Sequence, residues 1–288
     1  LEGVAECHDE LMDLYIHDQE PSEEKLRAGI RSATITQGLV PVLCGASFRN
    51  IGVQPLLDAV CDYLPSPLDV AVPAAHNPHT DEVIAVSPNE DASFSALAFK
   101  IARDQFVGKL YFIRVYSGML RAGETVLNVT RRRKERVSKL LRMHANKQEL
   151  IEEIKAGDIA AAVGLKDTTT GDTLCHDDHP LVFERIQFPE PVVSMFIEAK
   201  TKAEQDKLSN ALGLLQDEDP TFRVHYNQET GQTLMEGMGE LHLEILVDRM
   251  RREFNVEVLS GKPQVAYKET ITVPVEKVDY KHAKQTGG

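Results

Sequence analysis

The stretch GMGELHLEI, Gly237 to Ile245, decides the fold of the carboxyl-terminal part of the chain. It joins a strand-like run, Gln232 to Glu236, to a run in which apolar residues recur at helical spacing. The spacing predicts an amphipathic helix with one stripe facing a core, formed by Leu243, Leu246, Val247, Met250 and Phe254. The simplest alternative is that Gly237 and Gly239 mark no more than an ordinary turn between a strand and a helix.

The residues around this stretch extend the pattern to a whole domain. An alternating run at Val192 to Glu198 precedes a helical pattern at about Ala203 to Gln216. Strand-like runs follow near Phe222 to Tyr226 and Val256 to Leu259. The resulting order, β-α-β-β-α-β, predicts a ferredoxin-like domain over residues 188–266.

Short β-rich runs and turn signals alternate over residues 92–187. The turns are marked by Ser117-Gly118, Ala122-Gly123, Ala156-Gly157-Asp158 and Thr170-Gly171-Asp172. Short strands separated by turns at regular intervals predict a closed antiparallel β-barrel. The expected fold class is therefore multidomain α+β, with a barrel followed by a ferredoxin-like domain.

The first 68 residues have an α/β pattern. Residues 1–38 predict two helices, and Val40 to Cys44 is an all-apolar run typical of a buried parallel strand. Val53 to Leu64 predicts a helix that stops at Pro65-Ser66-Pro67. Residues 69–91 combine prolines with acidic residues and predict a linker, and residues 267–288 read as a tail or the start of a further domain.

Several of these stretches resemble translational elongation factor G, the ribosomal translocase. GMGELHLEI, with VDRMRREFNVEV and GKPQVAYKET after it, is similar to the third domain of that family. The resemblance continues through Val40–Val70, Phe94–Gly118 and Ala156–Cys175, and so covers nearly the whole chain. It implies that residues 1–68 are the carboxyl end of a GTPase domain and that YKHAKQTGG, Tyr280 to Gly288, enters a fourth domain. The chain is accordingly expected to be a fragment of a longer factor.

Charge is distributed unevenly along the chain. The formal net charge is −13, and residues 1–24 hold nine carboxylates and no Lys or Arg. Arg131 to Lys147 has the opposite bias, with eight basic residues against the single acidic residue Glu135. The overall acidity would ordinarily count against a nucleic-acid partner, but the first part of this stretch, Arg131 to Arg136 (the basic run), is a candidate for contact with RNA phosphates, and DNA is not expected as a partner.

Other classes of protein are disfavoured by composition. No apolar run approaches the roughly 18 to 20 residues of a membrane span, and the amino terminus is acidic where a signal peptide would be basic. The cysteines, Cys7, Cys44, Cys61 and Cys175, lie far apart, which argues against a disulfide framework or a cysteine zinc site. A cytoplasmic protein without membrane contact is expected, and no oligomer is expected.

The chain lacks the residues that would cradle a nucleotide phosphate. A phosphate-binding loop needs GxxxxGK[ST], and neither Gly108-Lys109 nor Gly261-Lys262 is followed by Ser or Thr. The chain alone is therefore expected to be inactive, with no catalytic residue and no cofactor of its own. The resemblance implies that the intact parent hydrolyses GTP with magnesium in the missing part. Asn146-Lys147-Gln148-Glu149 only superficially matches the guanine-reading NKxD motif.

The resemblance also implies a candidate nucleotide contact, a loop that lies beside the guanine base in the family. The family places a Ser-Ala-Phe step against the base, and this chain has Gly45, Ala46, Ser47 and Phe48, with Ala and Ser inverted. Cofactor contact through Gly45, Ala46 and Ser47 is the functional interpretation. The alternative is an ordinary strand-to-helix turn.

Histidine clusters do not predict a metal site. His176 and His179, and likewise His76 and His79, lie in polar segments near prolines, whereas zinc needs four converging ligands. His242, between Leu241 and Leu243, fits a partly buried, hydrogen-bonded residue, because no nucleophile or oriented carboxylate can be assigned to it.

The basic run is the strongest candidate for partner binding. Arg guanidinium groups match phosphate geometry and keep their charge in any environment. With the resemblance, this predicts contact with ribosomal RNA through Arg131, Arg132, Arg133, Lys134 and Arg136. A solvated hairpin is the alternative.

The predicted function follows from the resemblance. The chain is expected to belong to a translation factor that moves transfer RNA and messenger RNA through the ribosome, using GTP. A ribosomal protection protein of the tetracycline-resistance type shares the same domains and is the nearest alternative. A non-catalytic RNA-binding adaptor is an alternative of another class, which the lone strand-like run at Val40 to Cys44 disfavours.

Overall fold

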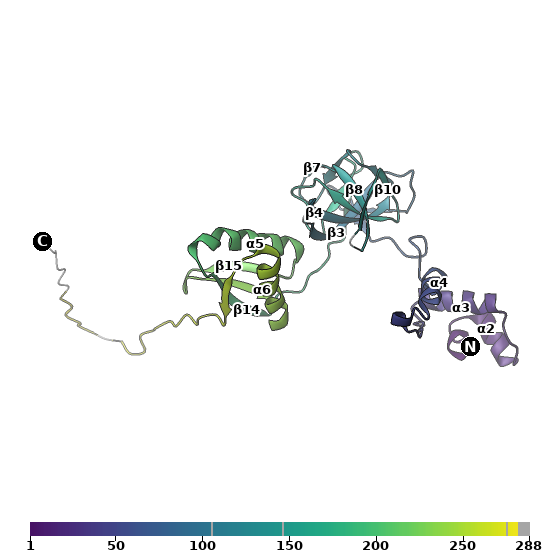
Figure 1. The fold of residues 1–288 in the computed structure, drawn as a ribbon, viewed down its shortest axis with the longest axis horizontal. Helices are drawn as coiled ribbons and strands as arrows, with labels where there is room; N and C mark the ends of the chain where they lie inside the picture. The colour runs from purple at the N-terminus through teal and green to yellow at the C-terminus, as the bar shows by residue number, and fades with distance from the viewer. Residues whose placement is uncertain (105, 146, 275, 282–288) are drawn as a thin grey trace. The chain divides into compact units, whose positions relative to one another are not determined.

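The computed structural model describes residues 1–104, 106–145, 147–274 and 276–281. The chain divides into two compact units, Leu1–Ile186 and Gln187–Gly288, which are described separately (Figure 1). Both units contain strands as well as helices, and the expected mixed α+β fold class is confirmed.

The second unit is a four-stranded antiparallel sheet with two helices. Its elements in chain order are β14 (Val193–Ala199), α5 (Gln205–Glu218), β15 (Arg223–Asn227), β16 (Gln232–Gly237), α6 (Glu240–Phe254) and β17 (Val258–Gly261), with a 3₁₀ turn at Lys202–Glu204. The strand order in the sheet is β15-β16-β14-β17, and every neighbouring pair is antiparallel. This is the ferredoxin-like arrangement that the β-α-β-β-α-β pattern predicts.

Helix α6 buries the stripe expected from the sequence. Leu243, Leu246 and Met250 are at most 3% exposed, and Val247 and Phe254 pack partly buried against the same core. That core also contains Leu208, Ala211, Leu212 and Leu215 of α5 and the inward face of the sheet. The helix ends at Asn255, which takes the left-handed conformation (φ 53°) common at helix ends.

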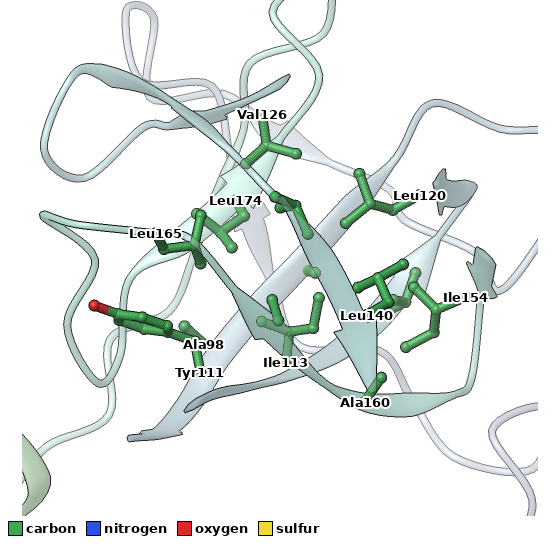
Figure 2. Packing of buried hydrophobic residues seen from close by; sticks show 14 of the residues in the cluster. Ala98, Tyr111, Ile113, Leu120, Val126, Leu140, Ile154, Ala160, Leu165 and Leu174 are labelled. Carbon is green, nitrogen blue, oxygen red and sulfur yellow. The ribbon is translucent and has the colours of Figure 1, made fainter. Parts of the chain in front are cut away.

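The barrel in the first unit is built from an eight-stranded antiparallel sheet. In sheet order these strands are β7 (Arg133–Arg136), β6 (Thr125–Asn128), β12 (Thr173–Cys175), β3 (Ser95–Asp104), β4 (Gly108–Ser117), β11 (Ile159–Val163), β8 (Lys139–His144) and β9 (Lys147–Ile151). The pair β5 (Met119–Arg121) and β10 (Glu153–Lys155) forms a separate two-stranded sheet, whose Leu120 and Ile154 pack into the barrel core. Figure 2 shows the strands around one apolar core, which includes Ile113, Leu120, Leu140 and Leu174.

Two short strands lie in the segment that the sequence predicts to be a linker. Strand β1 (Ala75–His76) pairs with both β2 (Val83–Ile84) and β13 (Val182–Phe183). Ala75 is fully buried, and it packs with Leu97, Leu181 and Phe183 in a small core of its own. Part of this segment is therefore ordered by sheet pairing that its prolines do not reveal.

The amino-terminal helices differ in number from the expectation. Three helices, α1 (Glu2–Ala5), α2 (Asp9–Ile16) and α3 (Glu23–Ile35), occupy the region where two were expected. Ser22 caps α3, because its Oγ accepts a hydrogen bond from the backbone N–H of Lys25 at 3.3 Å. Further along, a 3₁₀ turn (Ser47–Arg49) precedes α4 (Val53–Tyr63), which confirms the helix predicted there.

The strand expected at Val40 to Cys44 is wrong for this chain. These residues have no regular secondary structure, and Val40 and Val42 are 81% and 88% exposed. A parallel strand forms only against a neighbour that satisfies its backbone groups. No strand among the described residues pairs with this segment.

Candidate nucleic-acid interface

The basic run forms the β6–β7 hairpin of the barrel. Strand β7 pairs with β6 in the register Asn128 to Arg133 and Val126 to Glu135. Since Val126 belongs to the barrel core, Glu135 points inward with it, and Lys134 and Arg136 point to the opposite side. The turn contains Arg131 and Arg132, and Arg132 takes a left-handed backbone conformation (φ 56°). All five basic side chains of the run are exposed.

Three of the five basic residues form ion pairs within the barrel. The Nε atom of Arg131 lies 3.3 Å from Asp172 Oδ2, and its Nη2 donates to Thr169 Oγ1 at 2.6 Å. Arg133 Nη1 donates to Asp167 Oδ2 at 2.7 Å, and this hydrogen bond and charge raise the pKa of Arg133 above its ordinary value.

The third pair joins Lys134 to Asp177. Lys134 Nζ lies 2.6 Å from Asp177 Oδ2, and both side chains are 60% exposed. Exposed pairs of this kind contribute little to stability and can exchange one anionic partner for another. The pairs therefore reduce the local positive potential without blocking contact with phosphate.

Arg132 and Arg136 are the basic residues of the run without a carboxylate partner among the described residues. Arg136 Nε donates to the carbonyl oxygen of Gly123 at 3.0 Å, which fixes the side chain but leaves its charge uncompensated. Arg132 lies at the tip of the turn. These two guanidinium groups are the most available for an external phosphate.

The guanine-side loop is a separate candidate, built on the residues before α4. Ala46 and Ile51 form an isolated antiparallel bridge with N···O distances of 3.0 and 3.2 Å. Gly45 packs tightly, since a Cβ there would lie 3.0 Å from the carbonyl oxygen of Ile51. Gly45, Ala46 and Ser47 are all exposed, and so is Phe48. The loop and the basic hairpin lie on different parts of the chain and are separate candidates.

A hollow of about 540 Å³ lies beside this loop and is lined mainly by apolar side chains. It runs between the irregular segment at Val40 to Leu43 and helix α4. Its lining includes Leu39, Leu56, Val60 and Leu64, and the last three are 45% to 50% exposed. The apolar side chains around the hollow are therefore only partly covered by the described residues.

His242 has a structural role, because both of its ring nitrogens form hydrogen bonds within the ferredoxin-like unit. His242 Nδ1 accepts a hydrogen bond from the backbone N–H of Met238 at 3.1 Å, so Nε2 carries the proton that it shares with Asp219 Oδ2 at 2.9 Å. Burial raises the pKa of Asp219, but hydrogen bonds from Thr221 and the interaction with His242 outweigh this and hold the pKa below its ordinary value.

The other histidine contacts are an exposed pair at His179 and a half-buried pair at His176. His179 Nδ1 lies 3.3 Å from Asp178, and His176 Nε2 lies 3.9 Å from Glu124. Within the described parts of the chain, no group of three or more His, Cys, Asp or Glu residues is placed to hold a metal ion. Of the NKxD-like stretch, Asn146 lies outside the described residues, and Lys147 to Glu149 belong to β9.

Sequence reasoning missed the residues that support the basic hairpin. Glu135 is 7% exposed, and it accepts hydrogen bonds from the segment after β11. A lone acidic residue inside a basic run, at a position that alternation turns inward, was the available signal. Two further cations on the barrel were also missed: Lys100 lies 5.8 Å from the ring centre of Phe112, and Arg114 lies 5.2 Å from that of Tyr116.

Comparison with known proteins gives two family matches and a structural one. Residues 188–262 match the family model of Elongation Factor G, domain III, and residues 108–175 match that of Elongation factor Tu domain 2. A crystal structure of a protein from Thermus thermophilus is similar, with 26% sequence identity and a TM-score of 0.70. The similarity covers 92% of this chain and 37% of that chain, so this chain spans little more than a third of that protein.

The chain thus carries, in sequence order, two domains of the kinds found in translation elongation factors. The matches lie within the barrel and the ferredoxin-like unit and agree with the folds observed there. Among the helices of the described residues, none has the length and apolar character that crossing a membrane requires.

Proposed function

We propose that this chain is part of a translational GTPase of the elongation factor G type, which uses GTP to move transfer RNA and messenger RNA through the ribosome. The observation that carries the proposal is the succession of a Tu-type second domain and a G-type third domain on one chain. In this proposal the barrel docks on the ribosome, and the ferredoxin-like unit transmits movement. The protein acts in the cytoplasm.

The apolar hollow at α4 supports the further proposal that residues 1–68 end a larger GTPase domain. Leu56, Val60 and Leu64 on α4, with Val40 and Val42 on the segment before it, expose an apolar surface suited to a covering sheet. GTP and magnesium would be held by that domain, with Gly45, Ala46 and Ser47 beside the base.

Ribosomal RNA is the partner that the basic hairpin fits best. Its cations lie on β7, at the end of the strand order of the barrel sheet, and on the turn before it, and Arg132 and Arg136 have no carboxylate to compensate them among the described residues. Phosphate contacts by arginine are strong, because the planar guanidinium group can donate two parallel hydrogen bonds. The hairpin therefore supplies a backbone-contacting surface that does not depend on base sequence.

A single-turnover assay with the parent protein and ribosomes tests the proposal. A translocase moves messenger RNA by one codon in a GTP-dependent step, and Arg132→Gln with Arg136→Gln should slow this movement at limiting factor concentration. If the parent instead releases tetracycline from ribosomes without moving messenger RNA, the protection-protein alternative is correct. If it binds ribosomes but shows no GTP-dependent activity, the adaptor is correct.

A further inference from the structure

Glu135 is the one acidic residue of the basic run, and it is buried beneath the exposed cations. Its Oε2 accepts hydrogen bonds from the backbone N–H groups of Lys166 and Asp167, the latter at 3.0 Å. Its Oε1 accepts from Thr168 Oγ1 at 2.6 Å. A buried carboxylate is costly unless hydrogen-bond donors surround it, and here three donors from one segment do so.

These hydrogen bonds continue into a network that reaches both strands of the hairpin. Asn128, fully buried at the end of β6, donates from Nδ2 to Thr168 Oγ1 at 3.1 Å and to Asp172 Oδ2 at 3.0 Å. The Oδ1 atom of Asn128 accepts from the backbone N–H of Arg131 at 2.9 Å. Asp172, 3% exposed, also accepts from the backbone N–H of Thr169 at 2.8 Å.

The network fixes the base of the turn that carries Arg131 and Arg132. Strand β6 also pairs with β12 and contributes Val126 to the barrel core, and the buried polar contacts with residues 166–172 add a second anchor at the turn end of the hairpin. Arg132 has a positive φ that only a well-defined turn maintains, and Arg136 follows Glu135 directly. The hydrogen bonds of Glu135 therefore hold the strand that carries Arg136 and the base of the turn that carries Arg132, while Arg136 Nε is also held by the carbonyl oxygen of Gly123 at 3.0 Å.

We infer that Glu135 is a positioning residue for phosphate recognition: it touches no RNA, and it holds the hairpin on segment 166–172 so that Arg132 and Arg136 meet successive phosphates together. The inference rests on the proposed function of the hairpin. Charge alone gives the opposite expectation, because loss of a negative group beside five cations should strengthen phosphate binding. A positioning role thus predicts weaker phosphate binding when the hydrogen bonds of Glu135 are lost, whereas charge alone predicts stronger binding.

A pair of substitutions with equal charge separates the two effects. Glu135→Gln removes the charge but keeps a carbonyl oxygen for the two backbone N–H groups and an amide that can donate to Thr168. Glu135→Ala removes the same charge and all three hydrogen bonds. Each full chain is titrated with ribosomes and, separately, with heparin over a series of salt concentrations. Circular dichroism checks that each variant is folded at the assay temperature.

The expected result is that Glu135→Gln binds as tightly as the wild type or more tightly, with an unchanged salt slope. Glu135→Ala should bind about tenfold more weakly, and the slope of log affinity against log salt should fall by about 1, the loss of one phosphate contact. Thr168→Val, which keeps every charge and removes the hydroxyl that joins Glu135 to Asn128, should show a smaller loss in the same direction. This variant provides the test if Glu135→Ala does not fold.

Equal binding of the Gln and Ala variants, or of Thr168→Val and wild type where Ala is unfolded, would overturn the positioning role. A difference between the Gln and Ala variants on heparin, with no ribosome binding by the wild-type chain, would support positioning and overturn the proposed ribosomal function. Failure of the wild type to bind either probe would overturn both.

Discussion

Two leucines on α6 differ in burial, so their substitutions distinguish the effect of core packing from that of an apolar side chain in solvent. Leu246 is 3% exposed in the core of the ferredoxin-like unit, and Leu241 is 68% exposed. We expect Leu246→Ala to lower the free energy of unfolding of this unit by about 2 to 5 kcal/mol, because the change removes buried methyl groups and leaves a cavity. Leu241→Ala is the control and should change it by less than about 0.5 kcal/mol.

Hydrogen exchange of α6 peptides in the full chain measures both variants. Equal losses for Leu246 and Leu241 would contradict the assignment of Leu246 to the buried side of the helix, and a larger loss for Leu241 would place the buried stripe on the other side.

The contact between Asp219 and His242 predicts a pH dependence. The pKa of Asp219 is lowered in the folded state, so its ionised form stabilises the fold above the unfolded pKa of about 3.9. This contribution is lost as the pH falls through the lower folded-state pKa. Asp219→Asn should therefore destabilise the ferredoxin-like unit at about pH 6, and the difference from wild type should shrink below about pH 4.

Urea unfolding at several pH values, followed by circular dichroism, tests this expectation. A difference between Asp219→Asn and wild type that grows on acidification would contradict the assigned role of the carboxylate.

Turns between elements carry their own constraints, as Gly118 illustrates. It joins β4 to β5 with φ 68°, and a Cβ there would lie 2.6 Å from both Ala92 O and Phe94 N. Gly171 has φ 92° and no atom within 4 Å of such a Cβ. Both Ala substitutions should cost about 1 to 3 kcal/mol of backbone strain. Gly118→Ala should cost about 1 to 3 kcal/mol more, because the backbone at Ala92 and Phe94, just before β3, must move.

Thermal unfolding of the barrel, followed by exchange of β3 and β4 peptides, compares the two glycines. If the Gly171 variant proved the less stable, steric overlap at Gly118 would not be the dominant cost.

Elements with a clear period could be predicted from the sequence, and those that depend on distant partners could not. The stripe of α6 and the apolar side of α5 follow from helical spacing. Val40 to Cys44 has the composition of a strand but lacks a neighbour to pair with among the described residues. Local sequence encodes propensity, whereas a parallel strand depends on the rest of its sheet.

The candidate interface shows the same limit. The basic run was visible as a run of charge, but its division into paired and uncompensated cations was not. Asp167, Asp172 and Asp177 lie more than 30 residues further along the chain, and only the barrel topology brings them to Arg133, Arg131 and Lys134. RNA contact by the five basic residues and base contact by Gly45, Ala46 and Ser47 stay predictions.

For the whole molecule, we expect the chain to bind neither GTP nor GDP. It has no phosphate-binding loop, and the exposed loop at Gly45 to Ser47 offers only one or two backbone contacts. Isothermal titration of the chain with each nucleotide measures this. A micromolar dissociation constant corresponds to about −8 kcal/mol and would need phosphate contacts that the loop cannot supply. Such a value would contradict the proposal that GTP and magnesium are held by the rest of the GTPase domain in the parent protein.

The central claim is that this chain docks on the ribosome through the β6–β7 hairpin, and the salt dependence of ribosome binding tests it most directly. Arg132→Gln with Arg136→Gln should reduce the slope of log affinity against log salt by about 2, since each lost phosphate contact contributes about 0.9 for duplex DNA. Arg121→Gln with Lys155→Gln, on β5 and β10, removes the same net charge from the same barrel and should leave the slope unchanged. Parallel lines for wild type and the Arg132 and Arg136 variant would contradict the account and leave the hairpin as a solvated turn.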